Sequence, residues 1–259
     1  MTGGYCIDLS RFPSVPEGFY ATNSQFQIAG PKGFIQVKVL ENDKLYVRVD
    51  LPGVPDDAIR HRVDAVRQKI VFFSGETLRD GNVKEGVREY SGTAGLGCDC
   101  CEITGVDAKM KDGVLRMVVS RVKVKDHENK CDLVVPPFTG RSGRDIEDHP
   151  FVVRGRKGAL YGEATRGGRG GGLYFTVDVP GVSSEDAVEV FALEDEVRFY
   201  AEVKTASEHE ESARVYLGSV LSDAPSSRMP SLLSYAITWD VVFGVLKVRV
   251  APPSPNNNN

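Results

Sequence analysis

The sequence lacks the features that would assign it to a membrane or to a nucleic acid. No window approaches the roughly 18 uninterrupted apolar residues that a membrane-spanning helix requires. Asp and Glu number 36 against 32 Lys and Arg, so a formal net charge of −4 offers no broad positive field to a nucleic-acid backbone. Residues 1–6 have neither the basic nor the apolar region of a signal peptide. We expect a reducing, intracellular location, cytoplasmic or nuclear.

Cysteine and histidine are scarce and poorly placed for chemistry. The five cysteines are an odd number, and three of them crowd into Cys98–Cys101, which does not favour structural disulfides. A zinc site needs four ligands, and the next candidates, His127 and Cys131, lie some way off without paired spacing. Reduced thiols are the expectation and a metal site the less favoured alternative. No nucleophile motif accompanies the four histidines, so we expect no enzyme, no catalytic residue and no cofactor.

What the sequence does contain is one internal repeat. The segment Leu45–Val54 returns as Leu173–Val182, with the same alternation and the same Pro-Gly-Val ending. Further matches are 30–33 with 155–158, 88–90 with 214–216, and 113–115 with 244–246. The displacement between the copies grows by three residues by the last match, which we assign to an insertion at Asp240–Phe243. The chain is therefore a tandem of two similar units.

Both copies show the period-two pattern of strands. Leu45, Val47 and Val49 alternate with polar residues, and Pro52-Gly53 ends the strand. The pattern predicts strand pairs at 59–63 with 69–74, 106–110 with 114–119, and 188–191 with 197–201. No helical stripe flanked by caps occurs. The predicted fold class is all-β, with two tandem antiparallel β-sandwiches.

Proline, glycine and charge replace the apolar alternation at residues 135–144, as is typical of a linker. We therefore expect a first domain at 25–130, a linker at 131–150 and a second domain at 151–252. The end of the sequence, 253–259, is expected to be a disordered tail.

The repeated motifs resemble the α-crystallin domain of small heat-shock proteins. The resemblance rests on Val49–Val54, on Gly75-Glu76 at a strand end and on Gly113–Leu115. The second copy keeps Val177–Val182 but has Ala201-Glu202 in place of Gly-Glu. This family implies an immunoglobulin-like β-sandwich in each copy and a non-enzymatic, ATP-independent chaperone that binds partly unfolded proteins.

Two departures from the family pattern bear on function. The family's aromatic and Arg-rich strand before the last hairpin is replaced by Gly92–Cys98. The family's Ile-x-Ile/Val docking peptide has no counterpart after Leu246, because Val248 and Val250 are better explained as the last strand. We therefore expect a monomer or a dimer rather than a large oligomer. Tandem domains without this peptide resemble a plant group that includes anti-silencing adaptors of nuclear chromatin-regulatory complexes, so an adaptor is the alternative function.

The resemblance also implies a groove that binds partner proteins, between the strand after the Pro-Gly loop and the strand before Gly-Val-Leu. In the first copy it comprises Ile59, His61, Val63, Val106, Ala108 and Met110. The second copy is expected to be the poorer site, because the insertion at Asp240–Phe243 should distort its hairpin. The alternative is that Val122–Val124 or Val134-Val135 covers the groove. Neither a membrane nor a nucleic acid is an expected partner.

Three other motifs have structural explanations. Asp50 and Asp178 precede Pro-Gly and are expected to accept turn hydrogen bonds rather than to act as paired acids. The Arg-Gly-Gly run at 166–172 is expected to be a hairpin loop rather than an RNA-binding tract. The resemblance implies that the loops 76–87 and 203–213 correspond to the loop in which plant and bacterial family members carry a strand exchanged between subunits.

Overall fold

The computed structural model describes residues 6–7, 26–30, 35–66, 68–78, 87–96, 100–125, 151–154, 160–164, 172–221 and 231–251. Regular structure in these residues is β-strand, apart from one turn of 3-10 helix at Leu232–Ser234. The predicted all-β class is confirmed. The described segments contain no helix that is long and apolar enough to cross a membrane.

The chain divides into two compact units, each built around one copy of the repeat. The first-repeat unit comprises Pro16–Asn23 and Gly33–Lys157. The second-repeat unit comprises Met1–Val15, Ser24–Lys32 and Gly158–Asn259. The polypeptide therefore passes from one unit to the other more than once.

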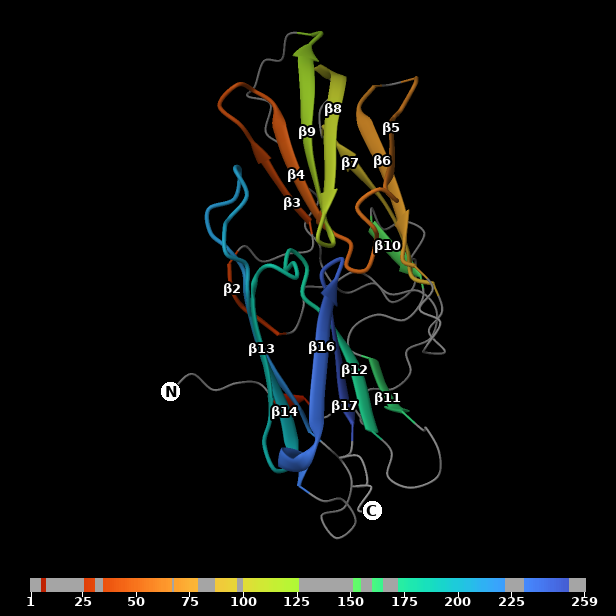
Figure 1. Ribbon diagram of the computed structural model, residues 1–259. Coiled ribbons are helices and arrows are strands. Elements are labelled where there is room, and N and C mark those ends of the chain that lie inside the picture. The colour runs from red at the N-terminus through yellow and green to blue at the C-terminus, as the bar shows by residue number, and fades with distance from the viewer. Residues whose placement is uncertain are drawn as a thin grey trace, which may run out of the picture. The chain divides into compact units, whose positions relative to one another are not determined.

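In the first-repeat unit the strands form two four-stranded sheets (Figure 1). One sheet has the order β3 (Ile35–Val39), β4 (Leu45–Asp50), β9 (Val114–Lys123), β8 (Cys101–Lys111). The other has the order β10 (Phe151–Arg154), β7 (Glu89–Gly95), β6 (Ile70–Glu76), β5 (Arg60–Val63). All their pairings are antiparallel, as the alternating sequence predicted.

The second-repeat unit repeats this topology. One sheet has the order β11 (Leu160–Ala164), β12 (Gly172–Asp178), β17 (Val245–Ala251), β16 (Ala236–Val242). The other contains β15 (Val215–Leu221), β14 (Glu196–Glu202) and β13 (Ala187–Ala192), with β1 (Cys6–Ile7) and β2 (Gln27–Ala29) both paired to β15. Apart from β1, which pairs with β15 in parallel and has no counterpart, the strands match those of the first-repeat unit, which agrees with the tandem β-sandwich architecture.

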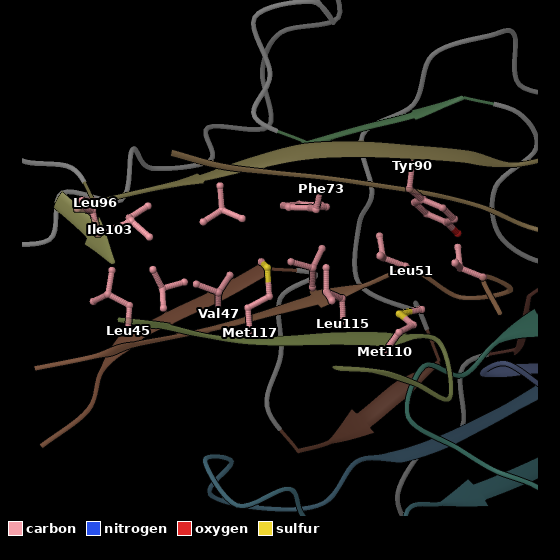
Figure 2. Close-up of a cluster of buried hydrophobic side chains, with 14 of the residues drawn as sticks. Leu45, Val47, Leu51, Phe73, Tyr90, Leu96, Ile103, Met110, Leu115 and Met117 are labelled. Carbon is pink, nitrogen blue, oxygen red and sulfur yellow. The ribbon is translucent and has the colours of Figure 1, made fainter. Parts of the chain in front are cut away.

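The core of the first-repeat unit lies between its two sheets. Figure 2 shows Val47 and Met117 facing Phe73, with Tyr90 at the end of the cluster opposite Leu96. These side chains are almost completely buried because every second residue of each strand points inward. Burying a side chain of this size contributes about 2 kcal/mol to stability. A corresponding cluster around Phe175, Phe199 and Tyr216 fills the second-repeat unit.

A buried Arg-Tyr pair closes one end of each sandwich on the Pro-Gly turn. The Tyr90 hydroxyl donates to the Pro52 carbonyl oxygen at 2.8 Å, and Arg88 Nη1 donates to the Tyr90 hydroxyl, also at 2.8 Å. The second-repeat unit has the same arrangement around Tyr216, whose hydroxyl donates to the Pro180 carbonyl oxygen at 2.6 Å. The Arg-x-Tyr repeat seen in the sequence therefore has one structural role in both copies.

Two strands pair outside the repeat that they precede, and here the units differ from the expected boundaries 25–130 and 151–252. Strand β2 lies just before the first repeat but pairs with β15 of the second-repeat unit. Strand β10 lies just before the second repeat but pairs with β7 of the first-repeat unit. Alternation of apolar residues does not distinguish between two similar sheet edges, so the sequence did not indicate this exchange.

The insertion expected at Asp240–Phe243 is wrong. Asp112-Gly113 and Phe243-Gly244 form two-residue turns of equal length, and both residues of each turn have positive φ. The change in displacement arises elsewhere. The turn between β13 and β14 spans only 193–195, where the first copy has 64–69, and a longer connection that includes the 3-10 turn precedes β16.

Candidate partner-binding edges

Strands β5 and β8 are the terminal strands of their two sheets and contact each other along one side of the first-repeat unit. Each pairs with one neighbour only among the strands that the structure describes, β5 with β6 and β8 with β9. The outward main-chain N–H and C=O groups of such terminal strands are the groups that pair with an added peptide strand.

Five of the six residues expected from the sequence lie on these two strands, and Ile59 directly precedes β5. We call the six residues the β5–β8 edge. Ile59, Val63, Val106 and Ala108 are partly exposed and pack against the core from outside. Met110 is buried in the core with an exposed fraction of 7%. His61 is exposed, although its pairing with Phe73 places it on the inward face of β5. Five of the six residues therefore join the apolar interior, while His61 stands at its rim.

Charge distinguishes this edge from its counterpart in the second copy. Arg60 and Arg62 flank His61 on β5 and are exposed, and the Arg62 guanidinium lies 4.4 Å from the centre of the Phe72 ring. At the position of Arg60 the second copy has Glu189, because Arg60 pairs with Ser74 as Glu189 pairs with Tyr200. The first edge is the more basic, which favours a partner with acidic residues beside its apolar ones.

In the second-repeat unit, β13 and β16 take the places of β5 and β8. Trp239 pairs with Val248 as Ala108 pairs with Met117, so an indole occupies the position that a methyl group occupies in the first copy. Trp239 is on the same side of β16 as Ile237 and Val241, which belong to the second core, and is 39% exposed. The second edge is therefore filled where the first edge has its smallest side chain.

Sequence reasoning missed this difference although the signal was present. Trp239 and Ala108 lie the same number of residues before the Gly-Val-Leu motif of their copy, so they align with each other in the sequence. The prediction that the second copy is the poorer site now depends on Trp239 and no longer on an insertion.

One of the two segments expected to cover the groove does not do so. Val122 belongs to β9, Lys123 pairs with Cys101, and Val124 donates its N–H to the Cys100 carbonyl oxygen. Val122 and Val124 are 49% and 43% exposed, so the segment lengthens the β8–β9 ladder instead of lying over the β5–β8 edge. The other segment, Val134-Val135, is outside the described residues.

Where the structure describes them, the remaining sequence motifs do not assemble a chemical site. Cys100 and Cys101 are buried, and their Sγ atoms lie 3.7 Å apart. The Asp50 carboxylate lies 3.9 Å from Arg48 Nε, and both side chains are buried. Among the residues placed by the structure, no three of His, Cys, Asp and Glu gather as metal ligands would. Cys98 falls outside the described residues.

Of the two loops that correspond to the exchanged strand of family members, the structure describes one completely and the other in part. Residues 203–213 contain no strand. Residues 79–86 of the other loop are outside the described residues, as are residues 165–171 of the Arg-Gly-Gly run. The strands on either side of that run, β11 and β12, form the expected hairpin.

Comparison with known proteins finds similarity to heat shock proteins of plants. The family model described as "Predicted plant small heat shock protein" matches residues 6–253. The chain is 36% identical over 117 residues to the "Putative 57 kDa heat shock protein" of Arabidopsis thaliana, covering 45% of this chain and 22% of that protein. It is 30% identical over 93 residues to the "Heat shock 22 kDa protein, mitochondrial" of Glycine max, covering 36% of this chain and 43% of that protein. The chain thus spans less than half the length of these relatives. No solved structure matches it.

Proposed function

Because the chain belongs to the family of plant small heat shock proteins, we propose that it is a non-enzymatic chaperone-like protein that binds an extended apolar segment at the β5–β8 edge. A client strand adds to an edge through main-chain hydrogen bonds and inserts alternate side chains between β5 and β8. Ala108 supports this assignment, because it is the smallest inward side chain on β8 and has partly exposed Val106 beside it.

The contrast between Ala108 and Trp239 carries the proposal. The same position on two equivalent strands bears a methyl group in one copy and an indole in the other. An edge that already holds an indole has less room for a partner's side chains. Of the two equivalent edges in the described part of the chain, the β5–β8 edge is the receptive one, and one client segment therefore binds there.

The test measures binding of a fluorescent peptide that carries two β-branched residues separated by one position, with an Asp at each end. Fluorescence anisotropy should give one peptide per chain. Ala108→Trp should weaken binding about tenfold, the loss expected from an overfilled contact. Lys109→Trp is the matched control, because Lys109 is the neighbouring residue of β8 and is exposed. Equal binding by Ala108→Trp, with the thermal transition retained, would refute the β5–β8 edge as the site.

A second candidate function is an adaptor that binds one defined protein at the same edge. A single receptive edge per chain suits a tether as well as a client-binding chaperone. The two functions differ in selectivity, because a chaperone suppresses heat aggregation of unrelated proteins and an adaptor retains one partner from a mixture. Light scattering of a heat-labile enzyme with and without the protein distinguishes them.

The proposal includes a cytoplasmic or nuclear location. Imaging a fluorescent fusion in plant cells would show whether the protein is there or in the mitochondria.

A further inference from the structure

Phe191 is exposed on the outer face of β13, with an exposed fraction of 44%. The alternate residues of this strand pack on the second core, namely Val188, Val190 and Ala192. Phe191 and Glu189 therefore point to the opposite side of the sheet, away from the core. The residues of β14 that share this side are Glu196, Arg198, Tyr200 and Glu202. We call Glu189, Phe191 and these four residues the β13–β14 outer face.

The first copy shows how an aromatic ring is covered at the equivalent place. Arg62 of β5 pairs with Phe72 of β6, and the Arg62 guanidinium lies 4.4 Å from the centre of the Phe72 ring. A cation over the face of an aromatic ring is attracted to it. Phe191 and Arg198 form the equivalent cross-strand pair of the second copy, with the two residue types exchanged between the strands. Each copy therefore places one Arg opposite one Phe on its outer face.

In the second copy the arginine is held by a carboxylate. Arg198 Nε donates to Glu196 Oε1 at 2.7 Å, and Arg198 Nη2 lies 2.5 Å from the same oxygen. The first copy has the apolar residue Ile70 at the position of Glu196. Because the ion pair runs along β14, it holds the guanidinium on that strand. The neighbouring Phe191 ring remains accessible to a cation from elsewhere.

Carboxylates lie around this ring. Glu189 is exposed two residues before Phe191, and residues 194–195, Glu and Asp, are exposed in the turn after it. On β14 the Tyr200 hydroxyl donates to the exposed Glu202 carboxylate. This hydrogen bond, burial and the charges of Glu202 and Glu189 raise the pKa of Tyr200, so both carboxylates act on this face. The surroundings of the ring are therefore negative and suit a positively charged partner.

From this arrangement we infer that the β13–β14 outer face docks a basic segment of another protein, with an arginine over the Phe191 ring. The carboxylates of Glu189 and Glu202 pair with further cationic side chains of the same segment. Arginine fits better than lysine because its planar guanidinium stacks on an aromatic face, as Arg62 does on Phe72. This surface goes beyond the proposed client site, since it lies in the other repeat and selects the opposite charge. A chain with both surfaces joins a partner with acidic residues to a partner with basic ones.

The first experiment measures binding of a fluorescent Gly-Ser-Arg-Val-Arg-Ser-Gly peptide to the full-length chain by anisotropy. Phe191→Ala should weaken binding about threefold to fivefold, the loss expected from one exposed contact between a cation and a ring. Val122→Ala is the matched control, because Val122 is an apolar residue of similar exposure, 49%, on another sheet. A peptide with Gln in place of both Arg should not bind. Equal binding by Phe191→Ala with the thermal transition retained, or binding of the Gln peptide, overturns the inference.

The second experiment uses the chain's own arginine as a competitor. Glu196→Gln removes the carboxylate that holds Arg198, so the guanidinium can cover Phe191 as Arg62 covers Phe72. Binding of the basic peptide should fall about threefold to fivefold in this variant. It should return when Arg198→Gln is added, because the competing cation is then gone. Unchanged binding in Glu196→Gln contradicts an arginine over the Phe191 ring.

Two further measurements separate this surface from the β5–β8 edge and from self-association. Ala108→Trp should leave binding of the basic peptide unchanged, and Phe191→Ala should leave binding of the Asp-ended client peptide unchanged. Loss of basic-peptide binding in Ala108→Trp would place that peptide at the β5–β8 edge and overturn the inference. Sedimentation of the chain alone should show no dimer that depends on Phe191. A concentration-dependent dimer that Phe191→Ala disrupts would make a second copy the occupant and would equally overturn it.

Discussion

Tyr90 and Pro52 are joined by a buried hydrogen bond, from the tyrosine hydroxyl to the proline carbonyl oxygen at 2.8 Å. The bond connects β7 of one sheet to the turn that follows β4 of the other. Arg88 Nη1 reinforces it by donating to both oxygen atoms, at 2.8 Å to the hydroxyl and 3.4 Å to the carbonyl. Since the same group of residues recurs at Tyr216, the bond is a shared structural device of the two units.

Removing this hydroxyl should destabilise the first-repeat unit. Tyr90→Phe leaves the Pro52 carbonyl and Arg88 with one fewer partner in a buried place, so we expect the free energy of unfolding to fall by about 1–3 kcal/mol. Urea denaturation followed by far-UV circular dichroism measures the change. Tyr216→Phe is the matched variant in the second-repeat unit and should cost a similar amount. If neither variant changes the urea midpoint, the bond does not contribute to stability.

Opening the second edge should add a binding site. Trp239→Ala puts a methyl group on β16 where β8 has Ala108. A neutral form of the β5–β8 peptide, with Asn in place of each Asp so that Glu189 does not repel it, should therefore bind two per chain instead of one. Calorimetric titration gives the stoichiometry. Removing a Trp that is 39% exposed should lower stability by less than the about 3–5 kcal/mol typical of a fully buried one. A stoichiometry that stays at one would show that Trp239 is not what closes this edge.

Substitution by alanine should destabilise the protein at Gly30 but not at Gly105. Gly30→Ala places a side chain at φ +89° against a backbone carbonyl, and we expect a loss of about 1–3 kcal/mol. Gly105→Ala adds a methyl group in open space within a strand, and stability should stay the same or rise slightly. Thermal denaturation of both variants beside the unmodified chain measures the difference. Equal transitions for the two variants would contradict the described backbone at Gly30.

The two fragments produced by cleavage between the repeats should remain associated. Limited proteolysis is expected to cleave first within 135–150, the stretch that its composition identifies as a linker. The N-terminal product carries β2, which pairs in the second-repeat unit, and the C-terminal product carries β10, which pairs in the first-repeat unit. The two products should therefore elute together on size exclusion and part only in denaturant. Separate elution under native conditions would contradict the exchange.

The sequence predicted the strands well and the exchange not at all. Alternation at Leu45, Val47 and Val49 predicts a strand because one face of a sheet is buried, and this pattern is local. The pairing of β2 is not local, because its partner strand lies far along the chain. Gly92 of β7 and Gly218 of β15 stand at similar positions, so the sequence near Phe26 does not indicate which of the two strands receives it. Which edge receives β2 depends on contacts far along the chain. The position of Trp239 could have been predicted from the sequence, but only after the two copies had been aligned correctly.

The reciprocal exchange of β2 and β10 also bears on how such a chain evolves. A tandem of self-sufficient domains tolerates deletion of either copy, because the survivor keeps all its strands. Here each copy completes a sheet of the other, so a deletion that removes one repeat with its leading strand leaves the other without the edge strand that normally covers it. An exposed edge of that kind promotes aggregation. Each half of such a chain is therefore needed to keep the other half fully paired, and the loss of either copy affects both.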